Sequence, residues 1–269
     1  MPPKKSNKTK SKKTKTGKGK GTKPVTRLSK PMKNAIQKIV RSDIETKYVT
    51  KYYGPSNFNG LISSKSEWLY PLPDVDQAAT GSLSASNNDR IGDTIMPTSL
   101  RVYVTASIGS TVLRTVDILV KFFVFSLKNA KNQATVSSAA SADAGNFLDA
   151  GSGNQAWTGE TTDLGLPLNT KAFTNIKTYS FRLSKGCGYI NGGSFSDTYV
   201  DGASRTFKHW VIDIPLPSNF KYNQNLDSQP QNFCPVMAVG YCHLDGTSAD
   251  SVSQDITVTY RSNLFFKDA

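Results

Sequence analysis

The chain has 269 residues, of which 33 are Lys or Arg and 20 are Asp or Glu, and its formal net charge at pH 7 is +13. No apolar run approaches the roughly 18 residues that a membrane-spanning helix needs, so we expect no membrane span. The N-terminus has neither the apolar stretch of a signal peptide nor the amphipathic face of a mitochondrial presequence, and we expect neither.

The net positive charge is confined to the first 41 residues. This arm holds thirteen lysines, Arg27 and Arg41 and no acidic residue, whereas residues 42–269 sum to −2. Too few of its residues are apolar to offset the entropy lost on ordering, so we expect disorder to about residue 28. A flexible polycation on a near-neutral body is typical of proteins that gather a phosphate backbone regardless of sequence. The predicted nucleic-acid-binding residues are Lys4, Lys5, Lys8, Lys10, Lys12, Lys13, Lys15, Lys18, Lys20, Lys23, Arg27, Lys30 and Lys33.

Two further features of the arm bear on its partner. Lysine offers a point charge and not a planar fork, so the arm suits phosphate neutralisation better than base reading. The runs Lys4-Lys5 and 8–15 also fit a nuclear-import receptor, so an import or solubility tail stays open as an alternative or second use. The glycine–lysine stretch 17–21 lacks the preceding strand and the Gly-Lys-Ser/Thr ending of a phosphate-binding loop.

A short helix is predicted at about 30–41, where the arm ends. Met32, Ile36, Ile39 and Val40 share one face, Ser29 is a possible cap, and Pro31 falls in the first turn. Two interpretations remain for this helix. It packs under the body through its apolar face, or it lines a surface that faces nucleic acid through Lys30, Lys33, Lys38 and Arg41.

Residues 42–269 are predicted to form one all-β, antiparallel domain. Apolar residues alternate with polar ones at 100–108, 178–184 and 255–261, which is the pattern of half-buried strands. The stretch 116–125 is apolar on both parities, so we expect a central strand covered on both faces. Turn-rich connections separate the strands, and no βαβ alternation implies a parallel sheet. Further strands are predicted at 45–53, 61–69, 207–214 and 236–243, with a short one at 220–222.

The longest connection, 128–171, is rich in Ala, Ser, Gly, Asn and Thr. Loops of this length in compact domains are usually functional or disordered. Its second half has enough apolar side chains to fold back on itself or onto a neighbour, and we interpret it as an elaborated surface loop. These side chains are Phe147, Leu148, Trp157, Leu164, Leu166 and Leu168.

No catalytic residue, metal site or cofactor is predicted, and we expect a protein that is not an enzyme. Cys242 and His243 are adjacent on a strand and point to opposite faces, so they cannot form a nucleophile–base pair. The carboxylates of Asp74 and Asp76, or of Asp89 and Asp93, offer oxygen ligands for calcium, but such residues in turns more often make caps and Asx turns. The cysteines, which also include Cys187 and Cys234, match no zinc spacing and indicate buried thiols in a reducing compartment.

Several short motifs, in this order and spacing, carry a resemblance over nearly the whole chain. After the lysine-rich arm come Glu45-Thr46-Lys47-Tyr48-Val49, then Arg90-Ile91-Gly92-Asp93-Thr94-Ile95, and finally Ser262-Asn263-Leu264-Phe265-Phe266-Lys267-Asp268-Ala269. Together they resemble the capsid proteins of small circular single-stranded DNA viruses that encode a replication initiator. The 128–171 connection has no counterpart in that family.

The resemblance implies a single eight-stranded jelly-roll sandwich of two four-stranded antiparallel sheets. It places strands B to I near 45–53 or 61–69, 95–108, 115–127, 174–184, 206–214, 220–222, 235–244 and 254–266. The 128–171 connection then joins strands D and E, at the end of the sandwich that clusters around five-fold vertices.

The expected function is that of a viral capsid protein that self-assembles into an icosahedral shell and packages a single-stranded genome, expected from the resemblance to be DNA. Its expected locations are the virion and, during assembly, the host nucleus. The alternative is a non-viral or ribosome-type nucleic-acid-binding protein with a β-barrel body, and a lectin-like jelly roll explains the arm poorly. A body that reads nucleic acid should gather Arg and aromatic residues on an exposed sheet face. The six arginines of the body are scattered over separate segments, which favours the shell.

Overall fold

The computed structural model describes residues 29–43, 45–62, 68–77, 89–108, 117–184, 188–191, 194–199, 206–223, 227–247, 249 and 254–268. The segment predicted to be disordered, up to about residue 28, lies outside these residues. The chain divides into two units, Met1–Asp43 and Ile44–Ala269. None of the helices in the described part is both long and apolar enough to cross a membrane.

The helix expected at about 30–41 is present as α1, Lys30–Asp43. Its first turn is closed by a 2.9 Å hydrogen bond from the Lys33 amide to the Ser29 carbonyl. Pro31 lies in this turn, where its missing N–H leaves no helical bond unmade. Met32 and Ile36, four residues apart on one face, are 55% and 43% exposed, so this part of the predicted apolar face is open.

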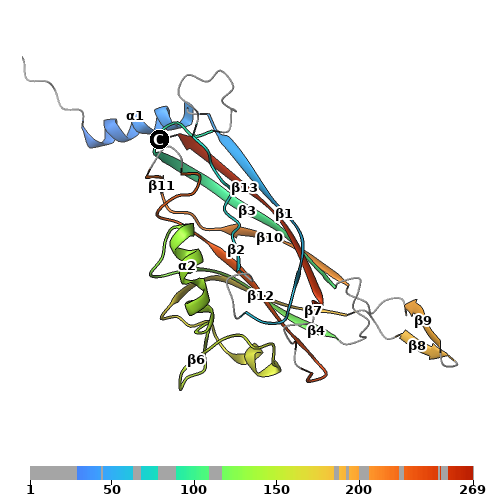
Figure 1. Cartoon of the computed structure of the whole chain (residues 1–269). Helices are drawn as coiled ribbons and strands as arrows, with labels where there is room; N and C mark the ends of the chain where they lie inside the picture. Colours follow the sequence, from blue (N-terminus) through green and yellow to red (C-terminus); the bar gives the residue numbers. More distant parts are fainter. Residues whose placement is uncertain are drawn as a thin grey trace, which may run out of the picture. The chain divides into compact units, whose positions relative to one another are not determined.

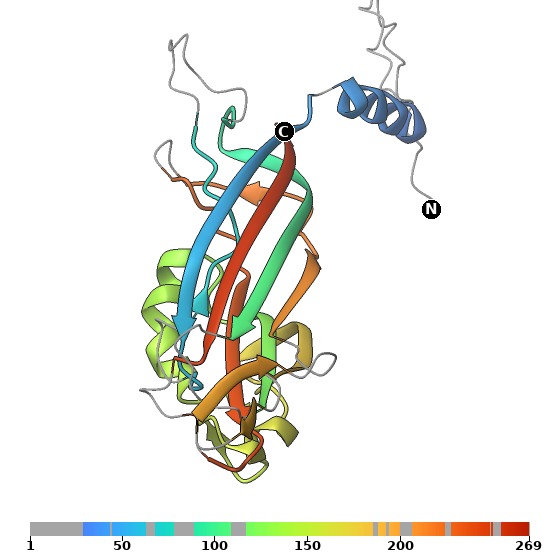
Figure 2. The same ribbon diagram turned by 90° about the vertical axis from the view of Figure 1, so that its right-hand side faces the viewer.

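The second unit is an all-β sandwich of two antiparallel sheets (Figure 1). Sheet 1 has the order β1 (Lys47–Phe58), β13 (Ile256–Asp268), β3 (Thr94–Ile108) and β10 (Phe207–Ile214). A short fifth strand, β11 (Phe220–Lys221), pairs with the start of β3. Figure 2 shows the four long strands of sheet 1 side by side.

Sheet 2 has the order β2 (Trp68–Leu69), β12 (Val236–His243), β4 (Ile118–Leu127) and β7 (Phe173–Leu183). All of its pairs are antiparallel, as predicted from the alternating pattern. Between β7 and β10 the chain forms a separate hairpin of β8 (Gly188–Asn191) and β9 (Ser194–Tyr199).

The eight main strands follow jelly-roll connectivity. Numbered in chain order, they give 1-8-3-6 in sheet 1 and 2-7-4-5 in sheet 2, which is the arrangement of a double-sheet jelly roll. The expected fold is therefore present.

The predicted order of the individual strands is wrong. The stretches that form β3, β4, β7 and β10 were predicted as the second to fifth strands, but they are the third to sixth. The stretches 45–53 and 61–69 are alternatives for the first strand in the prediction, whereas β1 and β2 are both strands of the sandwich. The stretch 220–222, predicted as the sixth strand, supplies only β11, and β10 is the sixth. The cause is the shortness of β2, in which only Trp68 and Leu69 pair.

This shift also moves the 128–171 connection, called the insertion below. It joins the fourth and fifth strands, β4 and β7, and not the third and fourth as predicted. The short connection 109–116 enters β4 at one end and the insertion leaves it at the other, so the two lie at opposite ends of that strand. The predicted place at the D–E end of the sandwich is therefore wrong.

The main core lies between the two sheets. Val102 and Val104 of β3 pack there, together with Val120 and Phe122 of β4 and Val258 of β13, all fully buried. Arg101 is exposed and Tyr103 is half-buried on the opposite parity of β3. The alternation predicted for this strand is therefore present, with the valines facing inward.

The insertion is a folded cap and not an open loop. It contains the helix α2 (Gln133–Ala144), the two-residue strands β5 (Leu148–Asp149) and β6 (Asn154–Gln155), and a 3-10 helix, Thr161–Gly165. The Asn132 side chain caps α2 by accepting a 2.8 Å hydrogen bond from the Thr135 amide. In Figure 1, α2 and β6 lie on the side of sheet 2 that faces away from sheet 1.

A second core joins the insertion to the outer face of sheet 2. Phe123 and Phe125 of β4 pack edge-on against Phe147 of the insertion, with ring centroids 5.0 and 5.4 Å apart. Since Ile118, Val120, Phe122 and Val124 of β4 supply the main core, β4 is buried on both faces. The prediction of a central strand covered on both sides is thus confirmed.

The contact between Trp157 and Gly240 brings the insertion close to sheet 2. Trp157 is fully buried, and a Cβ at Gly240 of β12 would lie 2.5 Å from its indole ring. Only glycine leaves room for the ring at this point of the strand. Trp157 also bonds through its carbonyl to the Ile62 amide, 3.1 Å away.

Hydrogen bonds of two ionisable side chains reinforce this cap. The Lys121 ammonium, on the outer face of β4, donates 3.0 Å hydrogen bonds to the carbonyls of Leu164 and Leu166. Burial lowers the pKa of Lys121, and the nearby Asp163 carboxylate opposes that shift. Asp163 is fully buried and accepts a 2.6 Å bond from the Thr158 amide, so its charge is compensated inside the insertion.

Arg90 ties together the connections that enclose the start of β3. Its buried guanidinium lies 4.2 Å from the Tyr222 ring centroid and donates to the carbonyls of Gly92 and, at 2.9 Å, Asp227. Asp93 is 3.6 Å away. Burial is the main cause that raises the Tyr222 pKa, and Arg90 opposes it. The first residue of the Arg90–Ile95 motif is therefore structural.

Replacement of Gly240 by Ala should weaken the docking of the insertion. The added methyl must displace the Trp157 ring, and overpacking of this kind typically costs about 1–3 kcal/mol. Denaturant unfolding followed by circular dichroism measures the loss. Gly165→Ala is the matched control, because a Cβ there meets nothing within 4 Å. Equal stability of the two variants would contradict the proposed close contact.

Candidate nucleic-acid interface

The structure describes two of the thirteen predicted nucleic-acid-binding residues, Lys30 and Lys33. Both are exposed on α1 and, three residues apart, share a face. The ten lysines from Lys4 to Lys23 and Arg27 lie outside the described residues, so nucleic-acid binding by the arm stays a prediction.

A second group of cations and aromatic rings lies on the body, on the side of sheet 1 that faces away from sheet 2. Strand register aligns these side chains in rows across the sheet. From β1 to β10, one row contains Tyr52, Arg261, Tyr103 and Val211, and the next contains Thr50, Asn263, Arg101 and Asp213. We call this surface the outer face of sheet 1.

Aromatic rings on this face are open to solvent. Tyr52 is 70% exposed, Tyr48 52% and Phe265 37%. Tyr48 and Phe265 are cross-strand partners with ring centroids 6.0 Å apart. Large exposed rings gathered on one sheet face are unusual for a surface that only contacts water.

Two arginines interleave with these rings. Arg101 of β3 and Arg261 of β13 lie on neighbouring strands, one row apart. The Arg101 guanidinium lies 2.7 Å from the Asp213 carboxylate, which is the main cause that raises the Arg101 pKa. Both partners are more than half exposed, so solvent screens the pair and it contributes little to stability. No ion pair of Arg261 is found among the described residues.

The prediction that the arginines of the body are scattered is therefore wrong for Arg101 and Arg261. They lie far apart in the sequence and meet because β13 pairs with β3. Tyr48, Thr50 and Tyr52 share one parity of the strand predicted at 45–53, which by itself does not show that they face outward. The pairing of β1 with β13 and of β13 with β3 was needed to place the rings beside the arginines.

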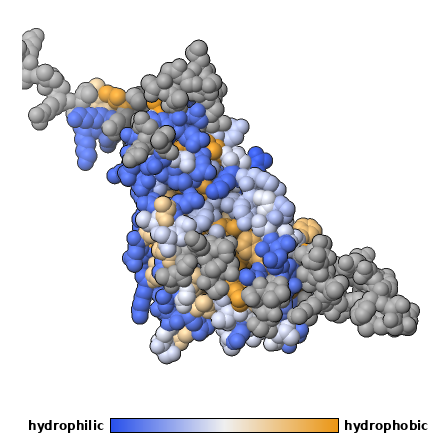
Figure 3. Space-filling model, in the orientation of Figure 1, coloured by the Kyte–Doolittle hydropathy of each residue, from blue (hydrophilic) through white to orange (hydrophobic). Residues whose placement is uncertain are grey.

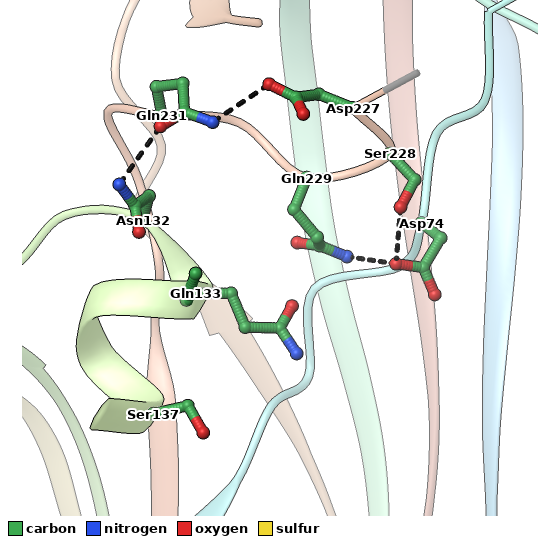
Figure 4. A pocket seen from close by; sticks show the side chains of 9 residues that line it. Asp74, Asn132, Gln133, Ser137, Asp227, Ser228, Gln229 and Gln231 are labelled. Atoms are coloured by element: carbon green, nitrogen blue, oxygen red, sulfur yellow. Dashed lines mark hydrogen bonds between the residues drawn. The ribbon is translucent and has the colours of Figure 1, made fainter. Parts of the chain in front are cut away.

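A polar pocket of about 540 Å³ lies between α2, the segment 227–231 and Asp74 (Figure 4). Its carboxylates already accept hydrogen bonds: Asp74 from the Gln229 amide at 2.6 Å, and Asp227 from the Gln231 amide at 3.0 Å. Gln231 in turn accepts a 3.0 Å bond from Asn132 at the start of α2. The hydrogen bond between Asn132 and Gln231 thus links the insertion to the 227–231 segment at this pocket.

Two of the four carboxylates considered as calcium ligands have other partners. Asp74 accepts bonds from Ser228 and Gln229, and Asp93 lies beside Arg90. Among the described residues, no three His, Cys, Asp or Glu side chains are grouped so that they could hold a metal ion.

His243 lies in a hydrogen-bonded chain that the sequence did not suggest. Its Nε2 is 2.6 Å from the Asp255 carboxylate and its Nδ1 is 3.1 Å from the Thr247 hydroxyl. This is the order of a hydroxyl–imidazole–carboxylate triad. However, the Thr247 hydroxyl donates to Asp245 at 2.6 Å, so its proton is not directed at the imidazole. The Asp255 amide donates to the Tyr241 hydroxyl, and the group braces the connection between β12 and β13.

Cys234 and Cys242 are free, buried thiols, as predicted. Burial raises the pKa of Cys234 to about 12 and that of Cys242 to about 11. A raised pKa keeps the thiol protonated at neutral pH and removes its nucleophilic form. Cys187 lies outside the described residues.

The chain matches no protein-family model and no curated protein. Among solved structures, it is similar to a chain in the cryo-EM structure of Mud crab tombus-like virus. The two are 11% identical, the match covers 96% of this chain and 94% of the other, and the TM-score is 0.30. This TM-score is too low to establish a shared fold, and the jelly-roll assignment is based on the strand order of the two sheets.

The buried thiols should not react in the native protein. In a Cys187→Ser variant at pH 8, we expect no thiol to titrate with a disulfide reagent before unfolding and two to titrate in denaturant, because both raised pKa values leave almost no thiolate. Absorbance of the released chromophore counts the thiols. Rapid reaction of one thiol in the native variant would show that Cys234 or Cys242 is accessible.

Proposed function

We propose that this chain is a viral capsid protein, whose jelly-roll body self-assembles into an icosahedral shell and whose N-terminal arm packages a single-stranded genome. The observation that carries the proposal is the division of charge. Fifteen cations and no acidic residue occupy the first 41 positions, and the rest of the chain sums to −2. That remainder is a jelly roll, a fold that recurs in viral capsids.

The arm supplies the affinity for nucleic acid in this proposal. Each lysine that neutralises a phosphate releases condensed counterions, which favours binding to any sequence. Lys30 and Lys33 extend the basic segment onto the exposed surface of α1. Since the arm holds only two arginines, it neutralises phosphates and does not read bases.

The body supplies the protein contacts of the shell. Its near-zero charge lets many copies approach one another without strong mutual repulsion. Hydrophilic residues cover most of the described surface in the view of Figure 3, with smaller hydrophobic areas between them. Shell assembly would bury part of this surface in contacts between copies.

The nature of the genome rests on the sequence resemblance, which favours single-stranded DNA. Under this proposal the chain resides in the virion, and the lysine runs of the arm also engage a nuclear-import receptor during assembly in the host nucleus. No enzymatic step is needed for either role.

A second candidate is a non-viral or ribosome-type nucleic-acid-binding protein. One observation favours it: Tyr52, Tyr103, Arg101 and Arg261 share the outer face of sheet 1, as a nucleic-acid-reading body would require. The two candidates differ in assembly, because only the first requires a closed shell.

Electron microscopy of the purified full-length protein distinguishes the two candidates. We expect closed, uniform particles after mixing with single-stranded DNA at low salt. Complexes that stay small and irregular over a range of protein and salt concentrations would contradict the shell and favour the second candidate.

Deletion of residues 1–23 should remove most of the affinity for nucleic acid. The deletion takes away ten lysines, and the log–log salt slope becomes shallower by about 0.7 for each phosphate of a single strand that is no longer neutralised. Fluorescence anisotropy with a labelled oligonucleotide measures both quantities. A truncated protein with the affinity and salt slope of the full chain would show that the arm is not the binding element.

A further inference from the structure

The two outer faces of the sandwich differ in what covers them. The insertion covers that of sheet 2 through the second core around Phe123, Phe125 and Trp157. The outer face of sheet 1 has no such cover among the described residues, and Tyr52 at its β1 edge is 70% exposed. A β-sandwich whose one outer face is open and rich in exposed rings is a candidate binding surface.

The spacing of the rings on this face suits unpaired bases. Tyr52 and Tyr103 are two strands apart in one row, which places them about 10 Å apart. Tyr48 lies four residues before Tyr52 on the same side of β1, about 13 Å along the strand. Rings at such separations on a four-stranded sheet can each stack one base of an extended strand.

The charge of the face suits a polyanion. Arg101 of β3 and Arg261 of β13 project outward in the two central rows, and Asp213 is the one carboxylate in these rows, so they sum to +1. The local excess is thus positive, although residues 42–269 as a whole sum to −2. A phosphate backbone complements these cations more strongly than a second copy of a body that is close to neutral, so charge complementarity favours nucleic acid over a protein partner.

We propose that the outer face of sheet 1 is a second nucleic-acid site that binds single strands, with bases stacked on Tyr48, Tyr52, Tyr103 and Phe265 and phosphates held by Arg101 and Arg261. This inference depends on the proposed function in one point only, which is that nucleic acid is the partner of the chain. The arm gathers phosphates of any nucleic acid, whereas the sheet selects unpaired bases. A duplex keeps its bases stacked on one another and offers the face only phosphates.

The test compares two double variants of the full chain, Tyr48→Leu with Tyr52→Leu and Tyr48→Phe with Tyr52→Phe. Both residues are more than half exposed, so neither change removes core packing. The Phe pair keeps the π faces and the Leu pair keeps only apolar surface. The probes are a labelled oligothymidylate of about 20 nucleotides and a duplex of the same length, measured by anisotropy at about 0.3 M salt, where the arm contributes less.

We expect the Leu pair to bind the oligothymidylate at least about tenfold more weakly than the parent, since each stacked base contributes severalfold or more. The Phe pair should bind within about twofold of the parent, and duplex affinity should change little in either variant. Photocrosslinking of a halogenated oligodeoxyuridine to the parent should label the peptide that contains Tyr48 or Tyr52.

Equal oligothymidylate affinity of the Leu pair and the parent would overturn the proposal. So would a Leu pair that keeps this affinity but fails to assemble, because the face would then be a contact between copies of the chain. Failure of the arm appears differently, as a shallow salt slope for the parent itself. The two proposals therefore fail by separate measurements.

Discussion

The close approach of Trp157 to Gly240 is the contact on which the asymmetry of the body depends. A strand residue with any side chain would hold the indole away from sheet 2, since even a Cβ at Gly240 would lie 2.5 Å from the ring. With the ring seated, Phe147 reaches Phe123 and Phe125, and Lys121 reaches the carbonyls of Leu164 and Leu166. β4 and β12 then have packed neighbours on both faces.

This arrangement separates two tasks on one sandwich. Sheet 2 and the insertion form a rigid, doubly packed half, in which buried charges such as Asp163 are compensated locally. Sheet 1 packs only against the main core, and no described residue forms a cover over its other face. In the function proposed for the arm it would meet nucleic acid through phosphates, and in the further inference the outer face of sheet 1 would meet it through bases.

Much of the fold could be predicted because its signals are local. Alternation in residues 100–108 indicates which side of β3 is buried, and apolar residues on both parities of β4 indicate that both of its faces are covered. The order and spacing of the short motifs, through the resemblance that they carry, predicted that the sandwich is a jelly roll. Strand identity could not be predicted, since two paired residues in β2 are too few to show a period.

The insertion and the outer face of sheet 1 needed tertiary information. The sequence of α2, QATVSSAASADA, has no apolar stripe, so its pattern does not predict a helix although Asn132 is a good cap. Trp157 could be recognised as apolar surface needing a partner, but not as the partner of a glycine more than 80 positions away. Arg101 and Arg261 look isolated until β13 pairs with β3.

Hydrogen–deuterium exchange of the full-length protein tests the central claim, that the insertion is an integral part of the folded body. The docked cap predicts slow exchange for the amides of Ile62 and Asn169, which bond to the carbonyls of Trp157 and Phe147, at rates close to those of β4 and β12. Complete exchange of residues 132–169 within seconds, while β4 and β12 stay protected, would show that the insertion is undocked and that sheet 2 is as open as sheet 1.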